Sequence, residues 1–462
     1  MAEREIAVID LKSFYSFVEC VDRGLDPFAT PLIVADKERG PNTIVMSVTP
    51  YLKSFGIPSV LRVKELPKKF NYIFATPRMS RYLEKSAQIV SIFMRFFDKS
   101  DIHVYSIDES FIDLTSYLKY YGKTSTELVK MIIDTIKEET NLVATAGVGD
   151  NFFLAKVALD IYAKHSKDGI AVMRKEDVPD KLWPITPLSK IWGIGSRLER
   201  RLNSFSIFTV QDLAFSNRDF IKSKLGIIGE QLIDHANGID ESDIHENYVP
   251  KETSFSLGQT LIRDYSKDEV PLLLKEMVDD LSLRLRNEEK MTSVVSLGVA
   301  YSKLQGGFSR QLTLLSSTDE TEKLYDAIME IYKKFIQDIA VRQLYISFGK
   351  LTDRKAQQLN IFEDTEKQVK KHNLQLAVDE LHNRYGKDII TRASALLDES
   401  TSKMRHGQIG GHRKWAIEVW KNGMLINHLL IIPKWSLKWT PEVKKSLNQS
   451  YLQMKKKKLI ID

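Results

Sequence analysis

Two adjacent carboxylates, Asp108 and Glu109, are the residues whose types and spacing best suit catalysis. They lie between two short apolar runs, Ile102–Ile107 and Phe111–Leu114, and this pattern predicts a β-hairpin whose packable strands the acids interrupt. Burying carboxylates there is costly unless something positive neutralises them. Taken alone, the pair is also typical of a turn or a solvated strand end, and that interpretation is the more common one.

A third carboxylate, Asp10, ends a similar apolar run that begins at Ile6. If the two predicted strands are neighbours, Asp10, Asp108 and Glu109 converge as a cage of three carboxylates. Cages made only of oxygen suit hard cations such as Mg²⁺. The sequence therefore predicts a candidate magnesium site at the end of these strands.

The residues around the acids form two recognisable blocks. Asp10 opens Asp-Leu-Lys-Ser-Phe-Tyr-Ser-Phe-Val-Glu, and the other acids lie in Tyr-Ser-Ile-Asp-Glu-Ser. In this order the blocks resemble the signature blocks of Y-family (translesion) DNA polymerases, most closely the DNA polymerase V catalytic-subunit (UmuC-type) branch with its Gram-positive members. The resemblance covers residues 4–414.

The resemblance implies an error-prone, DNA-directed DNA polymerase that carries out translesion synthesis in SOS DNA damage tolerance. It implies two Mg²⁺ ions, held by the carboxylates of Asp10, Asp108 and Glu109 and by the backbone carbonyl of Leu11. Primer–template DNA and deoxynucleoside triphosphates are the implied substrates.

The nucleotide site is expected beside the acids. The family places an aromatic residue under the sugar of the incoming nucleotide, where a ring leaves no room for a ribose 2′-OH, and Tyr15 matches this position. Phe14 is expected at the same site, packed into the core. Lys156, on a helix predicted over 151–164 with Asn151 as its N-cap, is expected to face solvent or DNA without a catalytic role. The positions that match the family's triphosphate contacts are Ser47, Lys53 and Lys164.

Composition fits a globular protein without directly indicating DNA. The chain has 462 residues, of which 43% are hydrophobic and 28% charged. The single cysteine, Cys20, excludes an internal disulfide and fits a reducing cytosol, and no signal peptide or membrane-spanning run is evident, so a cytoplasmic protein is expected. The net charge of +6 is carried by residues 415–462 alone, so any DNA contact must come from local patches.

The element pattern predicts an α+β chain of several domains, and the resemblance implies that these domains adopt the right-hand polymerase arrangement. Residues 1–185 alternate short strands and helices, which the resemblance makes a palm with a small fingers insertion at 25–75. Residues 186–246 form a predicted helical thumb, and 247–352 a little finger of βαββαβ order.

DNA contacts are expected in the thumb and the little finger. The stretch Trp-Gly-Ile-Gly fits a helix-hairpin-helix turn, in which Gly193 and Gly195 allow a tight turn and Arg197 follows as a phosphate clamp. In the little finger the candidate basic residues, each of which fits a solvated face equally well, are Arg263, Arg284, Arg286, Lys303 and Arg310.

Residues 353–414 are expected to hold a partner site and a C-terminal extension. The run Gln358-Leu359-Asn-Ile361-Phe362 resembles the bacterial sliding-clamp-binding pentapeptide, in which apolar side chains fill a groove and Gln358 gives polar recognition. An amphipathic helix is predicted over 366–397, either packed on the body or open to a partner. UmuC-type relatives commonly need an SOS accessory protein and a recombinase filament. The basic, Trp- and Lys-rich tail 415–462 resembles nothing familiar.

Two alternatives from other classes remain open at this point. One is a catalytically silent protein that binds DNA and the sliding clamp, against which stand three carboxylates that such a protein would not need. The other is a different palm enzyme, such as a nucleotidyl cyclase, which would need neither a helix-hairpin-helix nor a clamp motif.

Overall fold

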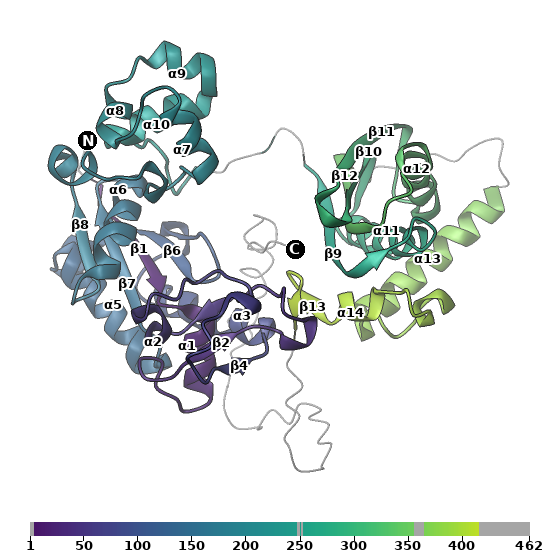
Figure 1. The fold of residues 1–462 in the computed structure, drawn as a ribbon, viewed down its shortest axis with the longest axis horizontal. Coiled ribbons are helices and arrows are strands. Elements are labelled where there is room, and N and C mark those ends of the chain that lie inside the picture. Colours follow the sequence, from purple (N-terminus) through teal and green to yellow (C-terminus); the bar gives the residue numbers. More distant parts are fainter. Residues whose placement is uncertain (1–3, 247–249, 251–252, 355–364, 415–462) are drawn as a thin grey trace. The chain divides into compact units, whose positions relative to one another are not determined.

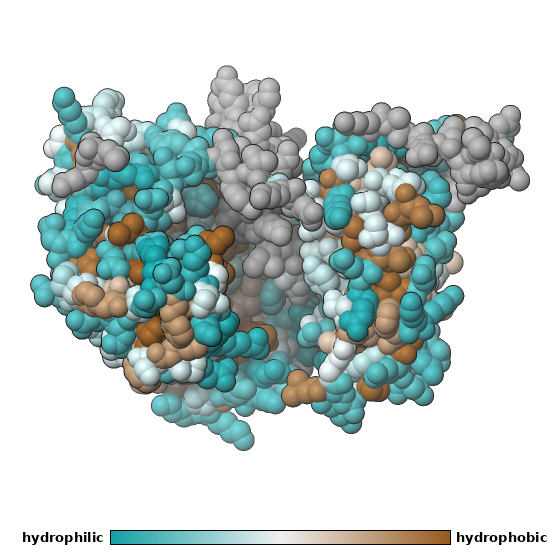
Figure 2. Space-filling model, turned by 90° about the horizontal axis from the view of Figure 1, so that it is seen from above, coloured by the Kyte–Doolittle hydropathy of each residue, from teal (hydrophilic) through white to brown (hydrophobic). Residues whose placement is uncertain are grey.

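The computed structural model describes residues 4–246, 250, 253–354 and 365–414 (Figure 1). The described residues before position 247 form one compact unit, and those from 250 to 414 form a second. Figure 2 shows hydrophilic residues over most of the visible face of each unit, with apolar residues in separate patches. Within the described parts of the chain, no helix combines the length and the apolar character needed to cross a membrane.

A five-stranded sheet organises the first unit. Its central strand β1 (Ile6–Leu11) pairs antiparallel with β6 (Glu109–Asp113) on one side and with β7 (Ala144–Gly149) on the other. At the edges, β5 (Ile102–Val104) completes the predicted hairpin with β6, and β8 (Ile170–Met173) runs parallel to β7. The neighbouring strands expected from the sequence are confirmed.

Helices cover both faces of this sheet (Figure 1). Side chains alternate along β1, so Ile6 and Val8 lie on one face, where they pack against the helix α6 (Phe152–Val157). Ile9 and Leu11 face the opposite way, towards α3 (Met79–Phe93), which contacts α5 (Ser125–Thr140). A short helix, α4 (Tyr117–Tyr121), follows β6.

The helix after β7 begins as predicted and then widens. The side chain of Asn151 caps α6 by accepting a hydrogen bond of 2.8 Å from the backbone N–H of Leu154. Beyond Val157 the helix continues as a π-helical stretch, Ala158–Tyr162, and a 3₁₀ turn, Ala163–His165. Local π-helical stretches are rare and often accompany functional side chains.

A small subdomain is inserted between β1 and α3. It holds the helix α1 (Phe14–Asp22), the strands β2 (Leu32–Val34) and β3 (Ser47–Val48), and α2 (Pro50–Ser54). A third strand, β4 (Ile73–Ala75), which the sequence did not indicate, pairs parallel with β2.

Four short helices follow the sheet region and share a core with α6. They are α7 (Ser196–Asn203), α8 (Val210–Ala214), α9 (Arg218–Leu225) and α10 (Ile227–Ala236). Leu202 and Leu232 pack with Phe153 and Val157 of the α6 segment, so this helical subdomain rests on the outer side of α6.

The second unit has the predicted βαββαβ order. Its sheet runs β11 (Gly307–Thr318), β10 (Lys290–Tyr301), β12 (Val341–Asp353) and β9 (Phe255–Tyr265), all antiparallel. The helices α11 (Val270–Asn287) and α12 (Thr321–Phe335) supply its core together with the inward-facing strand residues.

The C-terminal extension differs from the sequence expectation. The helix α13 (Thr365–Tyr385) ends well before 397, and it is followed by α14 (Ser402–His406), β13 (Gln408–Ile409) and β14 (His412–Arg413). Leu374 and Tyr385 are exposed, whereas Asp379 is buried against Arg286 of α11. The predicted bound at 397 was therefore wrong, and a buried ion pair attaches the helix to α11 while these apolar side chains remain exposed.

Candidate active site

The strand register places the three predicted acids together. Asp10 pairs directly with Glu109 across β1 and β6, and the backbone N–H of Leu11 donates a hydrogen bond of 2.9 Å to the carbonyl of Asp108. Ser106 Oγ donates a hydrogen bond of 2.8 Å to Asp108 Oδ1, which fixes this carboxylate at the hairpin turn. The convergence of the two acidic segments, inferred from their apolar runs, is confirmed.

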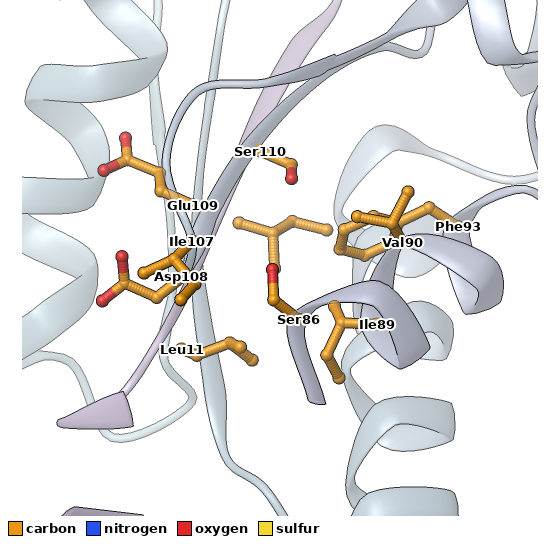
Figure 3. Close-up of a pocket in the computed structure, with 10 residues that line it drawn as sticks. Leu11, Ser86, Ile89, Val90, Phe93, Ile107, Asp108, Glu109 and Ser110 are labelled. Carbon is orange, nitrogen blue, oxygen red and sulfur yellow. The ribbon is translucent and has the colours of Figure 1, made fainter. Parts of the chain in front are cut away.

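The acids lie on the side of the sheet that α6 covers. Figure 3 shows the carboxylates of Asp108 and Glu109 pointing to the same side, away from Val90 and Phe93 of α3. Behind them a cavity of about 10 Å³, room for one water molecule, is lined mainly by apolar side chains of β1, β6 and α3. Apolar packing on the α3 side of the sheet therefore fixes the strand ends, and the carboxylates project from the α6 side.

Two lysines of the α6 segment neutralise these acids. Lys156 Nζ lies 2.7 Å from Glu109 Oε1 and donates a hydrogen bond of 2.8 Å to Oε2, and both side chains are buried. Lys164 Nζ lies 3.5 Å from Asp10 Oδ2. Asp160 joins the two, 3.2 Å from Lys156 and 2.8 Å from Lys164. The expectation that Lys156 faces solvent or DNA was wrong, because the side of α6 that carries Lys156 packs directly over the acidic strand end.

Burial and mutual charge shift the ionisation of the cluster. Burial raises the pKa of Asp10 to about 6, with Lys164 opposing the rise and Asp108 adding to it. Burial likewise raises the pKa of Glu109, against the lowering effect of Lys156. For Lys164, burial lowers the pKa but Asp10 and Asp160 outweigh it, so the net direction is upward. The cluster therefore favours cations beside its carboxylates.

The donor set fits a divalent metal. As the side chains stand, no three carboxylate, imidazole or thiol groups of the described residues lie in a metal-holding arrangement, since lysines engage Asp10 and Glu109. Glu109 Oε1 is buried and accepts no well-aligned hydrogen bond, and the cation beside it is Lys156 Nζ at 2.7 Å. The carboxylates of Asp10, Asp108 and Glu109 are hard oxygen ligands of the kind that Mg²⁺ prefers, and a metal would take the place of the lysine ammonium groups beside them.

The aromatic pair Phe14 and Tyr15 lies at the start of α1, in tilted ring contacts. Tyr15 lies over Tyr82 of α3, with ring centroids 4.7 Å apart, and Phe14 lies 5.6 Å from Tyr15 and is buried. Tyr82 donates a hydrogen bond of 2.7 Å to the fully buried carboxylate of Glu19, which Arg78 also binds at 2.9 Å. Sequence reasoning found Tyr15 but missed this support, whose residues come from two separate helices.

The two other residues predicted to contact the triphosphate, Lys53 and Ser47, differ in their exposure to solvent. Lys53 reaches solvent, yet partial desolvation lowers its pKa, an effect that Asp10 opposes and Lys164 and Lys12 reinforce. Lys53 is therefore electrostatically part of the acidic site. Ser47 is buried, and its hydroxyl donates to Ser16 Oγ at 3.0 Å, so in this structure it ties β3 to α1.

The helical subdomain contains the predicted turn. Gly193 has φ +89°, a left-handed conformation that suits glycine, and Gly195 directly precedes α7, on which Arg197 lies. A second turn of the same kind starts α10, where Gly226 has φ +67°. Next to the first turn, Trp192 Nε1 donates a hydrogen bond of 3.2 Å to the hydroxyl of Tyr105 in the acidic hairpin.

The basic candidates of the second unit divide into two groups. Arg263, Arg284 and Arg310 stack on the rings of Tyr265, Phe255 and Phe335, and Arg263 also pairs with Glu269 at 2.6 Å. Arg286 is buried: it binds Asp379 at 3.0 Å and the carbonyl of Asp319 at 2.9 Å. The suggestion that Arg286 contacts DNA was therefore wrong. The clamp-like segment Gln358–Phe362 and the tail 415–462 lie outside the described residues.

Comparison with known proteins agrees with this architecture. The impB/mucB/samB family pattern matches residues 9–160, its C-terminal domain pattern matches 252–361, and its helix-hairpin-helix motif matches 175–207. The Y-family DNA polymerase chimera Dbh-Dpo4(243-245)-Dbh superposes with a TM-score of 0.62 at 22% identity, over 76% of this chain and 99% of that one. The fold is thus that of a right-hand polymerase with palm, fingers, thumb and little finger.

Among curated relatives, Bacillus subtilis (strain 168) UvrX, provisionally named a UV-damage repair protein, is 37% identical over 89% of this chain and 98% of its own. DNA polymerase IV 2 of the same strain is 33% identical over 90% of this chain and 100% of its own. The chain belongs to the Y-family of DNA polymerases, in its impB/mucB/samB (UmuC-type) family.

Proposed function

We propose that this chain is a DNA-directed DNA polymerase that copies damaged template, as an error-prone enzyme of DNA damage tolerance and the SOS response. The observation that carries the proposal is the pairing of Asp10 with Glu109, with Asp108 at the adjoining turn, in a palm of this family. The names of the relatives, DNA polymerase IV 2 and a UV-damage repair protein, support the same activity.

The residues that would hold two Mg²⁺ ions are Asp10, Asp108 and Glu109 through their carboxylates and Leu11 through its carbonyl. When bound, such ions lower the pKa of the primer 3′-OH and neutralise the triphosphate charge. The protein's own part is to hold three carboxylates on adjacent strand ends against a packed apolar layer, so that little reorganisation is needed during reaction.

The remaining residues orient the nucleotide. Lys164 and Lys53 place positive charge beside the acids, where they would bind the phosphates of the incoming nucleotide. Tyr15, held by Tyr82, would lie under the sugar and exclude a ribose 2′-OH. Gly193, Gly195 and Arg197 of the thumb and Arg263, Arg284 and Arg310 of the little finger would bind DNA phosphates without reading sequence.

Primer extension tests the proposal. Wild-type protein with Mg²⁺ and all four dNTPs is expected to extend a primer past an abasic site or a cyclobutane dimer. The double variant Asp108→Asn/Glu109→Gln should retain roughly 1% of this activity or less, because the metal-binding carboxylates are lost. Asp134→Asn, which alters an exposed acid of α5 that pairs with Lys130, is the matched control and should extend normally.

Two results would contradict it. Stalling of the wild type at every lesion, with normal extension on undamaged DNA, would refute the translesion role. Failure of the wild type to extend any primer, even with sliding clamp and accessory proteins added, would favour a silent DNA- and clamp-binding protein.

A further inference from the structure

Charges of opposite sign alternate along one row in the palm. Lys156, Asp160 and Lys164 follow one another at four-residue spacing through α6 and its π-helical continuation. Glu109 lies at one end of this row, 2.7 Å from Lys156, and Asp10 lies at the other, 3.5 Å from Lys164. Asp160 binds both lysines, so a continuous line of ion pairs runs from one candidate metal ligand to another.

The Glu109 end of the row is the most deeply buried. Lys156 is 6% exposed and Glu109 is 7% exposed. Removing one partner of a buried ion pair leaves the other as an uncompensated charge, which is strongly destabilising. Glu109 must therefore keep a cation beside it, and before any metal arrives Lys156 is that cation.

The ammonium of Lys156 lies against both oxygens of this carboxylate. Lys156 Nζ donates a hydrogen bond of 2.8 Å to Glu109 Oε2 and lies 2.7 Å from Oε1. Lys156 thus fixes the orientation of the carboxylate, and a metal that binds Glu109 must displace the ammonium from at least one oxygen. A group whose rotamer is fixed by a buried neighbour is preorganised for binding.

We propose that Lys156 is the resident counterion and positioning residue of Glu109, and that Asp160 links it to Lys164 so that cations of the protein occupy the cage until metal and nucleotide replace them. The inference rests on the proposed metal site. When phosphates draw Lys164 away from Asp10, that carboxylate loses its cation and gains affinity for a metal. Triphosphate binding thus raises the affinity for metal. Because linkage is reciprocal, metal binding raises the affinity for triphosphate by the same factor.

The proposal predicts how the metal-free and metal-bound states differ. With Lys156 replaced by methionine, Glu109 lacks a counterion in the metal-free protein, and a bound divalent ion supplies one. Lys156→Met is therefore destabilised most in the absence of metal, and it binds metal more tightly than the wild type. A lysine that merely supported the fold would lower stability equally in both states.

The experiment measures Mn²⁺ binding to the full chain by calorimetry, without DNA or nucleotide, together with thermal unfolding in EDTA and in saturating Mn²⁺. Lys156→Met is expected to bind Mn²⁺ about tenfold more tightly than the wild type. Its melting temperature should fall by roughly 6 °C or more in EDTA, and the deficit should shrink by about 3–5 °C in Mn²⁺. In primer extension its kcat should fall with little change in KM for dNTP, because Glu109 is no longer oriented.

Two further variants complete the design. Lys156→Arg keeps the charge and should restore wild-type Mn²⁺ affinity and most of kcat. Lys181→Met alters an exposed lysine that pairs with Asp177 in the same unit, and it should match the wild type in every measurement.

The outcomes separate this inference from the proposed function. Equal or weaker Mn²⁺ binding by Lys156→Met, or an equal melting deficit with and without Mn²⁺, overturns the counterion role while leaving the metal site intact. Absence of saturable Mn²⁺ binding by the wild type, with and without a non-hydrolysable dNTP, or binding unaffected by Asp108→Asn, overturns the metal site and this inference with it.

Discussion

At the scale of single residues, the proposed selection of the sugar would depend on how firmly the ring of Tyr15 is held. Tyr15 rests on Tyr82, which is anchored in turn by the buried Glu19 and Arg78. Burial raises the pKa of Tyr15 to about 12, with Asp108 adding to the effect, so its hydroxyl stays neutral at physiological pH. In the proposed role, the ring of Tyr15 would therefore act by its shape and not by its charge.

Removing this ring should relax sugar selection. We expect Tyr15→Ala to raise the incorporation of ribonucleotides relative to deoxynucleotides by roughly 10²-fold, because the space for a 2′-OH opens. The measurement is kcat/KM for matched rNTP and dNTP in single-nucleotide extension. Tyr120→Ala, which removes an exposed ring of α4, is the control, and unchanged discrimination in Tyr15→Ala would contradict the gate.

The sequence located the acids but not their lysine partner. Asp10, Asp108 and Glu109 stand out because each interrupts or ends an apolar run, which is a local pattern. Lys156 is one charge among many in sequence, and its burial depends on α6 packing over β1 and β6. The four-residue spacing of Lys156, Asp160 and Lys164 was the available signal, since residues so spaced share one side of a helix.

At the scale of elements, the position of α6 depends on a glycine of β7. A Cβ built on Gly147 would lie 2.1 Å from the carbonyl oxygen of Ala155 and 2.3 Å from the backbone nitrogen of Leu159. The helix therefore lies directly against the strand backbone. Only a residue without a side chain permits this approach, which brings Lys156 over Glu109.

Gly147→Ala should push α6 away from the sheet. We expect a loss of about 1–3 kcal/mol in stability from overpacking, and a larger proportional loss of primer extension because Lys156 and Lys164 move with the helix. Calorimetry and extension assays on the same preparation check both effects. Gly349→Ala is the matched strand control, since its Cβ would meet nothing closer than 3.9 Å; equal behaviour of the two variants would contradict the packing argument.

The C-terminal extension should depend on the Arg286–Asp379 pair. Both side chains are buried, so Asp379→Asn is expected to cost about 3–5 kcal/mol by leaving the guanidinium without its counterion. The double variant Arg286→Met/Asp379→Leu should recover most of this loss. Hydrogen exchange over Thr365–Tyr385 reports whether α13 detaches from α11. If the losses of stability from the two single substitutions simply add in the double variant, the two residues do not act as a pair.

The same extension should respond to pH through His406. Burial lowers the pKa of His406, but Asp280 and Asp388 outweigh it, even with Lys387 and Arg405 nearby, so the net shift is upward from its ordinary 6.5. Because the pKa of His406 is higher in the folded protein than in the unfolded chain, its stabilising contribution is fully present at pH values below the unfolded-state pKa. This contribution is lost as the pH rises through the folded-state pKa. The second unit should therefore melt at a higher temperature near roughly pH 6 than near roughly pH 8.5.

Calorimetry at both pH values checks this expectation, with His406→Asn as the comparison. In that variant the difference in melting temperature between the two conditions should shrink. If it stays as large as in the wild type, His406 is not its source.

Elements with regular patterns were predictable, and those set by tertiary contact were not. The strands β1 and β6 followed from their apolar runs, and α6 was expected from the helix predicted over 151–164 with its Asn151 cap. The strand β4 is only three residues long and pairs with a strand far from it in sequence, so no local pattern marks it. The end of α13 was misjudged because Gly386, with φ +94°, follows Tyr385 and ends the helix there.

At the scale of the whole molecule, the balanced charge of residues 1–414 means that long-range attraction contributes little to DNA binding. DNA binding would then depend on the local basic sites proposed for the thumb and the little finger. A polymerase held by so few contacts is expected to dissociate readily from its primer, which gives a tethering motif a large effect on the length of DNA made.

The pentapeptide Gln358–Phe362 is the candidate tether, and its sequence supports a specific test. Leu359→Ala/Phe362→Ala truncates two of the three apolar side chains that would fill a clamp groove, while the palm acids stay unchanged. On a short oligonucleotide primer without clamp the variant should match the wild type. On a primed circle loaded with sliding clamp, product length should rise strongly for the wild type and by roughly tenfold less for the variant. A variant that responds fully to the clamp would exclude this motif as the tether, and a variant that fails on the short primer would indicate a defect in the catalytic body instead.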